Sequence, residues 1–377
     1  MRATERSRIA EGRPALATIV CWVGVTMSAA AYAQDSAKAS APSATPPVAL
    51  EPALQAAVRR HPEQFEAHHR LGEFHLRRGR LARAITSLER ARTLDPSHYT
   101  NGFDLAVAYI QTGRLREAHR QIESLLRQGS RAELQNLMGE LEEKRGDLQA
   151  AAEAYQRAAE MDQTEDHLFD FGNSLLQLDA HQQAAQIFAH AVTRYPAAGR
   201  LRVGLGIAQY SLGQYDDAVR SLCAAADLDP SDPRPHMFLG EMYGVSVSLA
   251  DEITSRLAKF VERNPAHAKA NYYYALALWK GKWGADPAID VALIEEHLTR
   301  AVKVDPRLST AHFQLGVLFS QQGRYPEAIR ALRTAVAVQP GMAEAHYRLA
   351  GAYQRTGQKT LADREMAVFK QLKAREK

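Results

Sequence analysis

The sequence predicts an all-α protein made of about nine stacked helix pairs. A small residue, usually the Gly of a Leu-Gly pair, recurs in steps of 33 to 35 residues, with one longer step of 41. Apolar residues three and four apart fill the stretches between these markers, which is the spacing of helices with one buried face. A period of this length indicates a repeat architecture. The recurring small residues are Gly72, Ala106, Gly139, Gly172, Gly206, Gly240, Ala275, Gly316 and Ala350.

The copy "STAHFQLGVLFSQQGRYPEAIRALRTAVAVQP" at residues 309–340 shows why a first helix, a turn and a second helix are expected in each unit. An amphipathic first helix ends at a Gly-containing turn, Pro326 is tolerated at the start of the second helix, and Pro340 ends it. The small residues Gly316 and Ala328 let neighbouring helix axes approach closely. Larger residues are expected to fill the space between the helices, namely Leu88, Tyr155, Phe188 and Leu332.

This pattern resembles the tetratricopeptide repeat (TPR), a 34-residue helix–turn–helix, over about residues 65–376. The resemblance implies an α-solenoid of about nine units that forms a right-handed superhelix. Residues 50–64 look like the second helix of a missing first unit and are expected to form an N-terminal capping helix. The units are expected near residues 65–98, 99–131, 132–164, 165–198, 199–232, 233–267, 268–308, 309–342 and 343–376, within a solenoid that covers 65–377.

Residues 1–33 have the layout of a secretory signal peptide. A basic start is followed by the apolar run "ALATIVCWVGVTMSAA" and by "AYA", which predicts cleavage between Ala33 and Gln34. The alternative is an uncleaved membrane anchor, because the run approaches a spanning length of roughly 18 residues. Residues 34–49, rich in Ala, Pro and Ser, are expected to form a flexible linker. We therefore expect an exported, periplasmic protein, or alternatively a membrane-anchored one with a periplasmic solenoid.

The composition argues against several classes of function. The formal net charge is +4 and four Arg lie in the N-terminal segment, so the remaining chain gives no electrostatic footprint for nucleic acid. Without Cys21 only Cys223 remains, which excludes an internal disulfide. No Gly-x-Ser-x-Gly, His-Glu-x-x-His or phosphate-loop motif is present. We therefore expect no enzyme activity, no catalytic residue, no cofactor and no metal.

Two groups of polar residues have structural explanations. Four histidines lie close together in the sequence, namely His61, His68, His69 and His75. His68 and His75 share a helix face but fall at packing positions, with no carboxylate pair to complete a metal site, so a metal-dependent hydrolase is only a distant alternative. The paired acids Glu142–Glu143 have basic neighbours and are expected on a solvated helix surface.

The resemblance also implies a partner-binding groove, because the first helices of TPR units line the concave face. By repeat phase, one row of this face contains Asn136, a second row contains Glu140 and Asn173, and the middle and C-terminal units are apolar. The apolar stretch is densest in "NYYYALALW" at 271–279, and such a patch is typical of peptide-binding surfaces. The residues expected to bind the partner are Tyr210, Met237, Tyr272, Leu276, Trp279, Phe313 and Val317.

Some TPR proteins clamp a C-terminal carboxylate with Lys and Asn residues of successive units. Here Phe169 stands at the place of the Lys and Gly204 at the place of an Asn, while Asn173 alone matches. We therefore do not expect this clamp.

Two units depart from the period. Unit seven carries a seven-residue insertion in "KGKWGADPAID", and its Trp283 is a candidate anchor for a partner, although a tolerated surface insertion explains it equally well. Unit six has one extra residue in its turn, and Ile253 and Phe260 replace the usual Ala.

These observations together predict an exported scaffold that binds a protein or peptide in its groove, for the assembly of a cell-envelope complex. The alternative is a structural subunit that self-associates through its terminal repeats.

Overall fold

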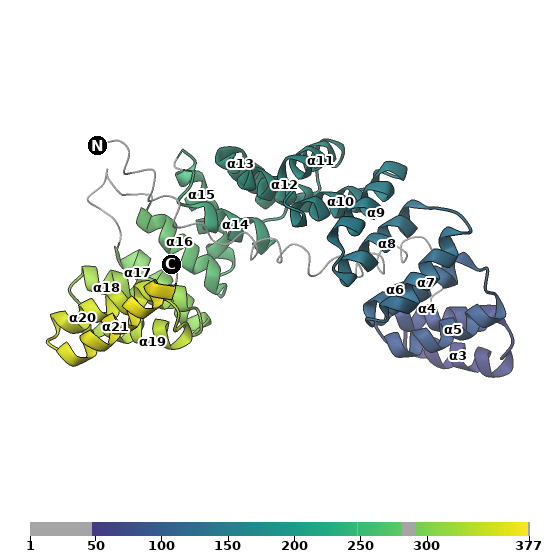
Figure 1. Cartoon of the computed structure of the whole chain (residues 1–377), viewed down its shortest axis with the longest axis horizontal. Helices are drawn as coiled ribbons and strands as arrows, with labels where there is room; N and C mark the ends of the chain where they lie inside the picture. The colour runs from purple at the N-terminus through teal and green to yellow at the C-terminus, as the bar shows by residue number, and fades with distance from the viewer. Residues whose placement is uncertain (1–46, 247, 281–290, 376–377) are drawn as a thin grey trace. The chain divides into compact units, whose positions relative to one another are not determined.

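The computed structural model describes residues 47–246, 248–280 and 291–375 (Figure 1). These residues form 19 helices and no strand, which confirms the all-α solenoid class. No helix among them is both long and apolar enough to cross a bilayer. The expected signal peptide, its cleavage site at Ala33 and Gln34, most of the linker and Trp283 lie outside the described residues.

The chain divides into two compact bodies, of which the N-terminal one ends at Pro196. It begins with α3 (Pro47–Arg60), which starts three residues before the expected capping helix and contacts α4. Four antiparallel pairs follow, and each pair contacts the next. They are α4 (Phe65–Arg77) with α5 (Leu81–Leu94), α6 (Tyr99–Gln111) with α7 (Leu115–Leu126), α8 (Ala132–Arg145) with α9 (Leu148–Met161), and α10 (Glu165–Gln177) with α11 (His181–Arg194).

The C-terminal body, from Ala197 onwards, contains five more pairs. Each pair again contacts the next, because α13, α15, α17 and α19 each contact the helix that follows. They are α12 (Gly199–Ser211) with α13 (Tyr215–Leu228), α14 (Pro233–Met242) with α15 (Ala250–Arg263), α16 (Ala268–Lys280) with α17 (Val291–Val304), α18 (Ser309–Gln321) with α19 (Tyr325–Val338), and α20 (Ala343–Arg355) with α21 (Lys359–Arg375).

The recurring Gly lets the two helices of a unit touch. A Cβ atom added to Gly172 would lie 2.7 Å from the ring of Phe188, and one added to Gly316 would lie 2.4 Å from Leu332. Such distances are shorter than real Cβ contacts, so a side chain at either glycine would force its neighbour to shift. The large residues expected between the helices, Leu88, Tyr155, Phe188 and Leu332, are all buried. The steric prediction drawn from the repeat is therefore confirmed.

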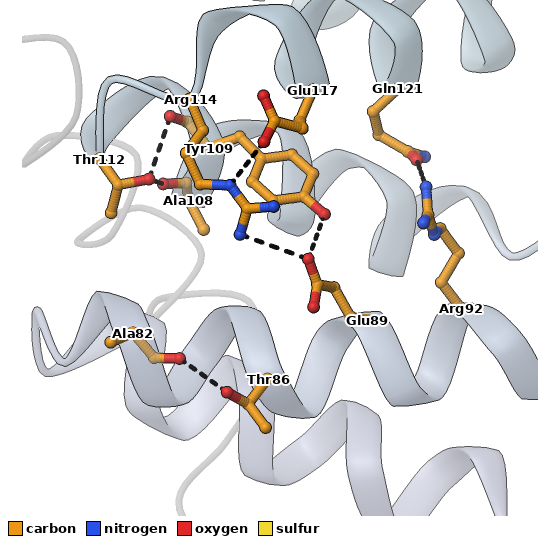
Figure 2. Close-up of polar contacts among 10 residues, drawn as sticks. All are labelled: Ala82, Thr86, Glu89, Arg92, Ala108, Tyr109, Thr112, Arg114, Glu117 and Gln121. Atoms are coloured by element: carbon orange, nitrogen blue, oxygen red, sulfur yellow. Dashed lines mark hydrogen bonds and ion pairs between the residues drawn. The ribbon is translucent and has the colours of Figure 1, made fainter.

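Neighbouring units are also joined by polar contacts, of which the joint between α5, α6 and α7 is the clearest (Figure 2). The Tyr109 hydroxyl donates a hydrogen bond of 2.6 Å to Glu89, and the Arg114 guanidinium lies 4.5 Å from the centre of the Tyr109 ring. Arg114 also pairs with Glu89 at 3.4 Å. Burial, followed by the bond to Glu89, raises the pKa of Tyr109 to about 12, so the hydroxyl keeps its proton as a donor.

Buried histidines close the turns between units. Nε2 of His68 donates to the Pro62 carbonyl at 2.8 Å, and Nε2 of His346 donates to the Pro340 carbonyl at 3.0 Å. Nδ2 of Asn271 makes the same bond to Pro265 at 3.0 Å. Each of these residues stands four positions before the small residue of its repeat and caps a carbonyl six residues earlier.

Two of the histidines that lie close together near the N-terminus have hydrogen-bond partners. Nε2 of His68 is engaged by a backbone carbonyl, and Nδ1 of His69 lies 3.2 Å from Oδ1 of Asn101. Within the described ranges, no set of three or more His, Cys, Asp and Glu side chains is placed to hold a metal ion. His68 and His69 therefore make structural hydrogen bonds, whereas the buried Nδ1 of His75 has no hydrogen-bond partner.

Unit six is packed differently from its neighbours. Its first helix, α14, meets α16 of the next unit more extensively than its own partner α15, whereas in the other units the contact within the pair is the larger one. As a result Gly240 accommodates Tyr273 of the next unit, which would lie 2.3 Å from an added Cβ. The space within the unit is filled instead by Ile253 and Phe260, both buried, with the Phe260 ring stacked 4.2 Å from His236. The larger residues at these two positions thus compensate for an altered helix contact.

Candidate functional site

The first helices of adjacent units contact one another within each body, as α8 does with α10 and α14 with α16. The row of residues that directly follows the recurring small residue lies at these contacts. Four of its members are apolar, namely Val107, Ile207, Leu276 and Val317, and four are polar, namely Glu73, Glu140, Asn173 and Glu241. Three of the four polar residues lie in the N-terminal body.

Two hydrogen bonds join α8 to α10 across this face. Nδ2 of Asn136 donates to Oδ2 of Asp170 at 2.9 Å, and Nε2 of Gln177 donates to Oε1 of Glu143 at 2.7 Å. The Tyr155 hydroxyl, from α9, donates to the other oxygen of Glu143 at 3.1 Å. Burial, and then the charges of Asp170, Glu143 and Glu140, hold the pKa of Tyr155 well above its usual value, so these carboxylates surround one hydroxyl.

Between these two hydrogen bonds lies the pair Glu140 and Asn173, which we call the open rung because no hydrogen bond joins the two residues. Glu140 stands four residues after Asn136 and three before Glu143, while Asn173 stands three residues after Asp170 and four before Gln177. Because residues at these spacings share a helix face, Glu140 and Asn173 face each other between the flanking bonds. Asn173 is only 7% exposed, yet its Oδ1 has no hydrogen-bond partner. The buried Oδ1 of Asn136 has none either.

We call this set the α8–α10 face: Asn136, Glu140, Glu143, Asp170, Asn173 and Gln177. Its electrostatics favour a cation. Burial raises the pKa of Glu140. The charge of Lys144, four residues on, lowers this pKa, and the charge of Glu143 raises it further. A carboxylate whose ionised form is disfavoured in this way gains from a cation brought close to it.

Other first helices of both bodies carry carboxylates in a similar state. Burial, with help from the charge of Glu73, raises the pKa of Asp104 on α6 to about 7, and Arg77 only partly opposes this. Burial also raises the pKa of Glu241 on α14, although a hydrogen bond of 3.1 Å from the Tyr273 hydroxyl stabilises its ionised form.

The expected partner-binding residues all lie in the C-terminal body. Tyr210, Met237, Tyr272, Trp279, Phe313 and Val317 are half-buried. Tyr272 and Trp279 pack on an apolar cluster that includes Leu298 and Leu315, so each presents only part of its ring to solvent. Met237 and Phe313 likewise pack on neighbouring clusters. The residues therefore serve the core as well as the surface.

Leu276 is different, because only 4% of it is exposed. It belongs to the row that directly follows the small residue of the repeat, and little of its side chain is open to solvent. A contact of Leu276 with a partner stays a prediction.

The paired acids Glu142–Glu143 also differ from expectation. Glu142 is buried and pairs with Arg145 at 2.9 Å, and Glu143 is held by Tyr155 and Gln177. The expected solvated surface is therefore wrong for Glu142, while Glu143 is half-buried and makes specific hydrogen bonds. The sequence does contain a signal for the α8–α10 face, namely polar residues at positions 136, 140 and 143 and at 170, 173 and 177, which is helical spacing on two consecutive first helices.

A groove of about 670 Å³ lies between α9, α10 and α11, with Leu168, Phe171 and Leu175 in its floor and mainly Gln and Glu at its rim. None of its lining residues has a buried polar atom without a partner. The α8–α10 face, where such atoms do occur, is therefore the stronger candidate for a ligand.

Comparison with solved structures returns distant likenesses. YrrB, described as a TPR protein with an unusual peptide-binding site, is 22% identical, covers 48% of this chain and 95% of its own, and has a TM-score of 0.41. MamA from Desulfovibrio magneticus RS-1 is 20% identical, covers 47% of this chain and 95% of its own, and has a TM-score of 0.39.

The C-terminal part of a TPR repeat-containing protein from Cytophaga hutchinsonii is 16% identical, covers 74% of this chain and 99% of its own, and has a TM-score of 0.47. Likenesses this distant say nothing about function. Comparison with curated proteins finds no match.

Family models give the clearer result. Tetratricopeptide repeat models match residues 51–99, 76–141, 132–165 and 175–242, and a TPR repeat model matches residues 318–357. These matches fall in both bodies, and the one over residues 132–165 spans the pair α8 and α9. The chain belongs to the tetratricopeptide repeat superfamily.

Proposed function

We propose that this chain is an exported bacterial scaffold that binds a protein or peptide partner along its first helices, for the assembly of a cell-envelope complex. Proteins built from TPR units serve widely as protein-binding scaffolds, and this supports the general role. The envelope location is supported by the signal-like sequence of residues 1–33. The proposal includes no catalytic residue and no cofactor.

The observation that carries the proposal is a set of half-buried aromatic residues on the first helices. Both helices of a pair supply large buried residues, such as Leu201 on α12 and Phe188 on α11. The first helices of the C-terminal body keep half-buried aromatic residues in addition, including Tyr272, Trp279 and Phe313. Aromatic side chains that are partly buried and partly open are typical anchors of protein interfaces.

Truncation of the aromatic residues is a poor test, because Tyr272 and Trp279 pack on the apolar cluster around Leu298. Their replacement by Ala would unsettle the fold, so lost binding would have two explanations. A photo-reactive residue at an exposed position avoids this difficulty. Gln321 on α18 is exposed and stands one turn after Val317 on the same helix face, and Arg330 on α19 is an exposed position on a second helix.

The experiment compares Gln321→p-benzoyl-Phe with Arg330→p-benzoyl-Phe, each in the full chain and irradiated in the cell envelope. We expect a cross-link to a different protein from position 321 and little from position 330. A cross-link from 321 to a second copy of the chain would instead favour the self-associating subunit. Cross-links that come only from 330 would contradict binding along the first helices.

Export is tested separately by mass spectrometry of the protein isolated from its native cells. We expect a mature chain that begins at Gln34. An intact Met1 on a membrane-bound protein would favour the anchored alternative, with the solenoid on the periplasmic side.

A further inference from the structure

We propose that the α8–α10 face binds an Arg or Lys side chain, so that the partner of this scaffold presents a basic segment to the N-terminal body. This inference rests on the proposed scaffold function and specifies the chemistry of the partner. It is carried by the open rung between Glu140 and Asn173 on two consecutive first helices.

The hydrogen-bonding groups of the face call for a donor. The two buried side-chain atoms here that have no hydrogen-bond partner are Oδ1 of Asn136 and Oδ1 of Asn173, and both are acceptors. Glu140 adds a carboxylate, which is also an acceptor. Guanidinium and ammonium groups donate hydrogen bonds and accept none, so they complement this set, whereas a carboxylate ligand would not.

Asn173 occupies a position where the repeat does not need a polar residue. The equivalent residues of units two, five, seven and eight are apolar, and those of units one, three and six are glutamates, so Asn173 is the one amide in the row. A buried amide oxygen without a partner destabilises a fold, so the simplest packing solution at this position is apolar. The polar choice in unit four, opposite a carboxylate, is therefore better explained by a ligand than by folding.

The charges around the rung also favour a cation. Glu143 and Asp170 flank it on either side, and each already accepts a hydrogen bond that keeps it in place. Lys144 is the opposing charge closest in sequence, and it is exposed. A metal ion fits less well, because the described residues provide no group of three His, Cys, Asp or Glu ligands. A side-chain cation needs no such closed set of ligands.

The amide oxygens are covered in the structure, so a ligand reaches them only after the amides turn. Rotation of the Asn173 amide about χ2 is easy, because this torsion is broad, and its Oδ1 gives up no hydrogen bond in turning. The Asn136 amide is held by Asp170, so Glu140 and Asn173 provide the first contacts of the ligand.

The test uses the full chain and a short fluorescent peptide of alternating Arg and Gly, with matched peptides in which Gln or Glu replaces each Arg. Affinity is measured by fluorescence anisotropy at one fixed, moderate salt concentration, since charge-based binding depends on salt. We expect the Arg peptide to bind at least about 10-fold more tightly than the Gln peptide, as one or two charge-assisted hydrogen bonds imply.

Three variants locate the site. Glu140→Gln should weaken binding of the Arg peptide by about 10-fold, while Glu160→Gln, which removes the same charge from an exposed position on α9, should change it less than about 2-fold. Asn173→Val should also weaken binding, yet leave the midpoint of urea unfolding unchanged or higher, because an unpaired buried oxygen is removed. A residue needed only for packing would not show this combination.

The proposal is overturned if the Arg peptide binds no better than the Gln peptide, or if Glu140→Gln and Glu160→Gln weaken binding equally. Failure of this inference can be told apart from failure of the scaffold function. If the cross-link from position 321 captures a partner while the Arg peptide shows no preference, the scaffold stands and the basic segment is wrong.

Discussion

Asp179 adopts a backbone conformation that the chain otherwise gives to glycine. Its φ is +56°, and the equivalent turn residues Gly79, Gly113, Gly213 and Gly323 have φ between +66° and +76°. An L-residue with a Cβ is disfavoured in this region, although Asp tolerates it better than most. The backbone geometry of this turn therefore explains why the other units have glycine there. Among the described turns of this kind, unit four is the exception because it has Asp.

The Asp179→Gly variant should therefore be more stable than the natural chain, by about 0.5–1 kcal/mol in the free energy of unfolding. The opposite change, Gly213→Ala, should lower stability by about 1 kcal/mol. Urea unfolding followed by circular dichroism measures both. A lower midpoint for Asp179→Gly would mean that the aspartate makes a contact that outweighs the backbone strain.

Asp104 should make stability depend on pH in a particular direction. Its pKa is raised to about 7 in the folded chain, against 3.8 for the group itself, because burial disfavours the ionised form. The folded state therefore binds more protons than the unfolded state between these values. The contribution of Asp104 to stability is fully present below about pH 4 and is lost as the pH rises towards 7.

Asp104→Asn removes this titration. At pH 8 the variant should be more stable than the natural chain by about 1–3 kcal/mol, and the difference should shrink towards pH 4. Thermal unfolding at several pH values measures the trend. A variant that loses stability most strongly at pH 8 would show that the ionised carboxylate is paired in the folded chain.

Single residues also show which contacts could be predicted from the sequence and which could not. The pairing of Gly172 with Phe188 follows from the repeat alone, because the fit of two helices in one unit depends on residues at a fixed separation. The burial of Leu276 and the hydrogen bonds of Glu143 did not follow. They depend on contacts between neighbouring units, where the identity of the facing residue changes from one joint to the next. The α8–α10 face belongs to this second class.

At the scale of one helix pair, the recurring Gly sets how closely the two axes approach. A Cβ on Gly206 would lie 2.8 Å from Leu222, whereas a Cβ on Gly351 would meet nothing within 4 Å, although both glycines lie within first helices. Gly206→Leu should therefore overpack the pair and cost roughly 1–3 kcal/mol.

Gly351→Ala is the matched control and should raise stability by about 0.5–1 kcal/mol, because Ala favours the helix more than Gly does. Differential scanning calorimetry of the two variants separates steric crowding from helix propensity. An unchanged melting temperature for Gly206→Leu would contradict the close helix contact.

Unit six shows the limit of prediction at this scale. The sequence indicated a departure through its longer turn and through Ile253 and Phe260. It did not indicate that Gly240 would receive Tyr273 from the following unit. A repeat pattern predicts the contact that each position makes in most units. It can therefore show that a unit deviates, but not which residue takes the place of the usual contact.

At the scale of the whole chain, each unit is stabilised by its neighbours, so the ends have less support than the interior. The last helix, α21, has Ala362 as its buried residue, whereas α19 buries Ala328, Ile329, Ala331, Leu332 and Ala335. Hydrogen exchange should therefore be fastest in the final turns of α21 and much slower in α19. Slower exchange in α21 than in α19 would show that the C-terminal helix is covered in solution.

The central claim is that the partner binds along the first helices and not along the second helices. It is tested most directly by hydrogen–deuterium exchange of the full chain, alone and with the protein captured by the cross-link from position 321. The account predicts new protection in the first helices, in α8 and α10 or in α16 and α18, with the second helices α9, α11, α17 and α19 unchanged. Protection confined to the second helices, or to α3 and α21 at the two ends, would contradict it.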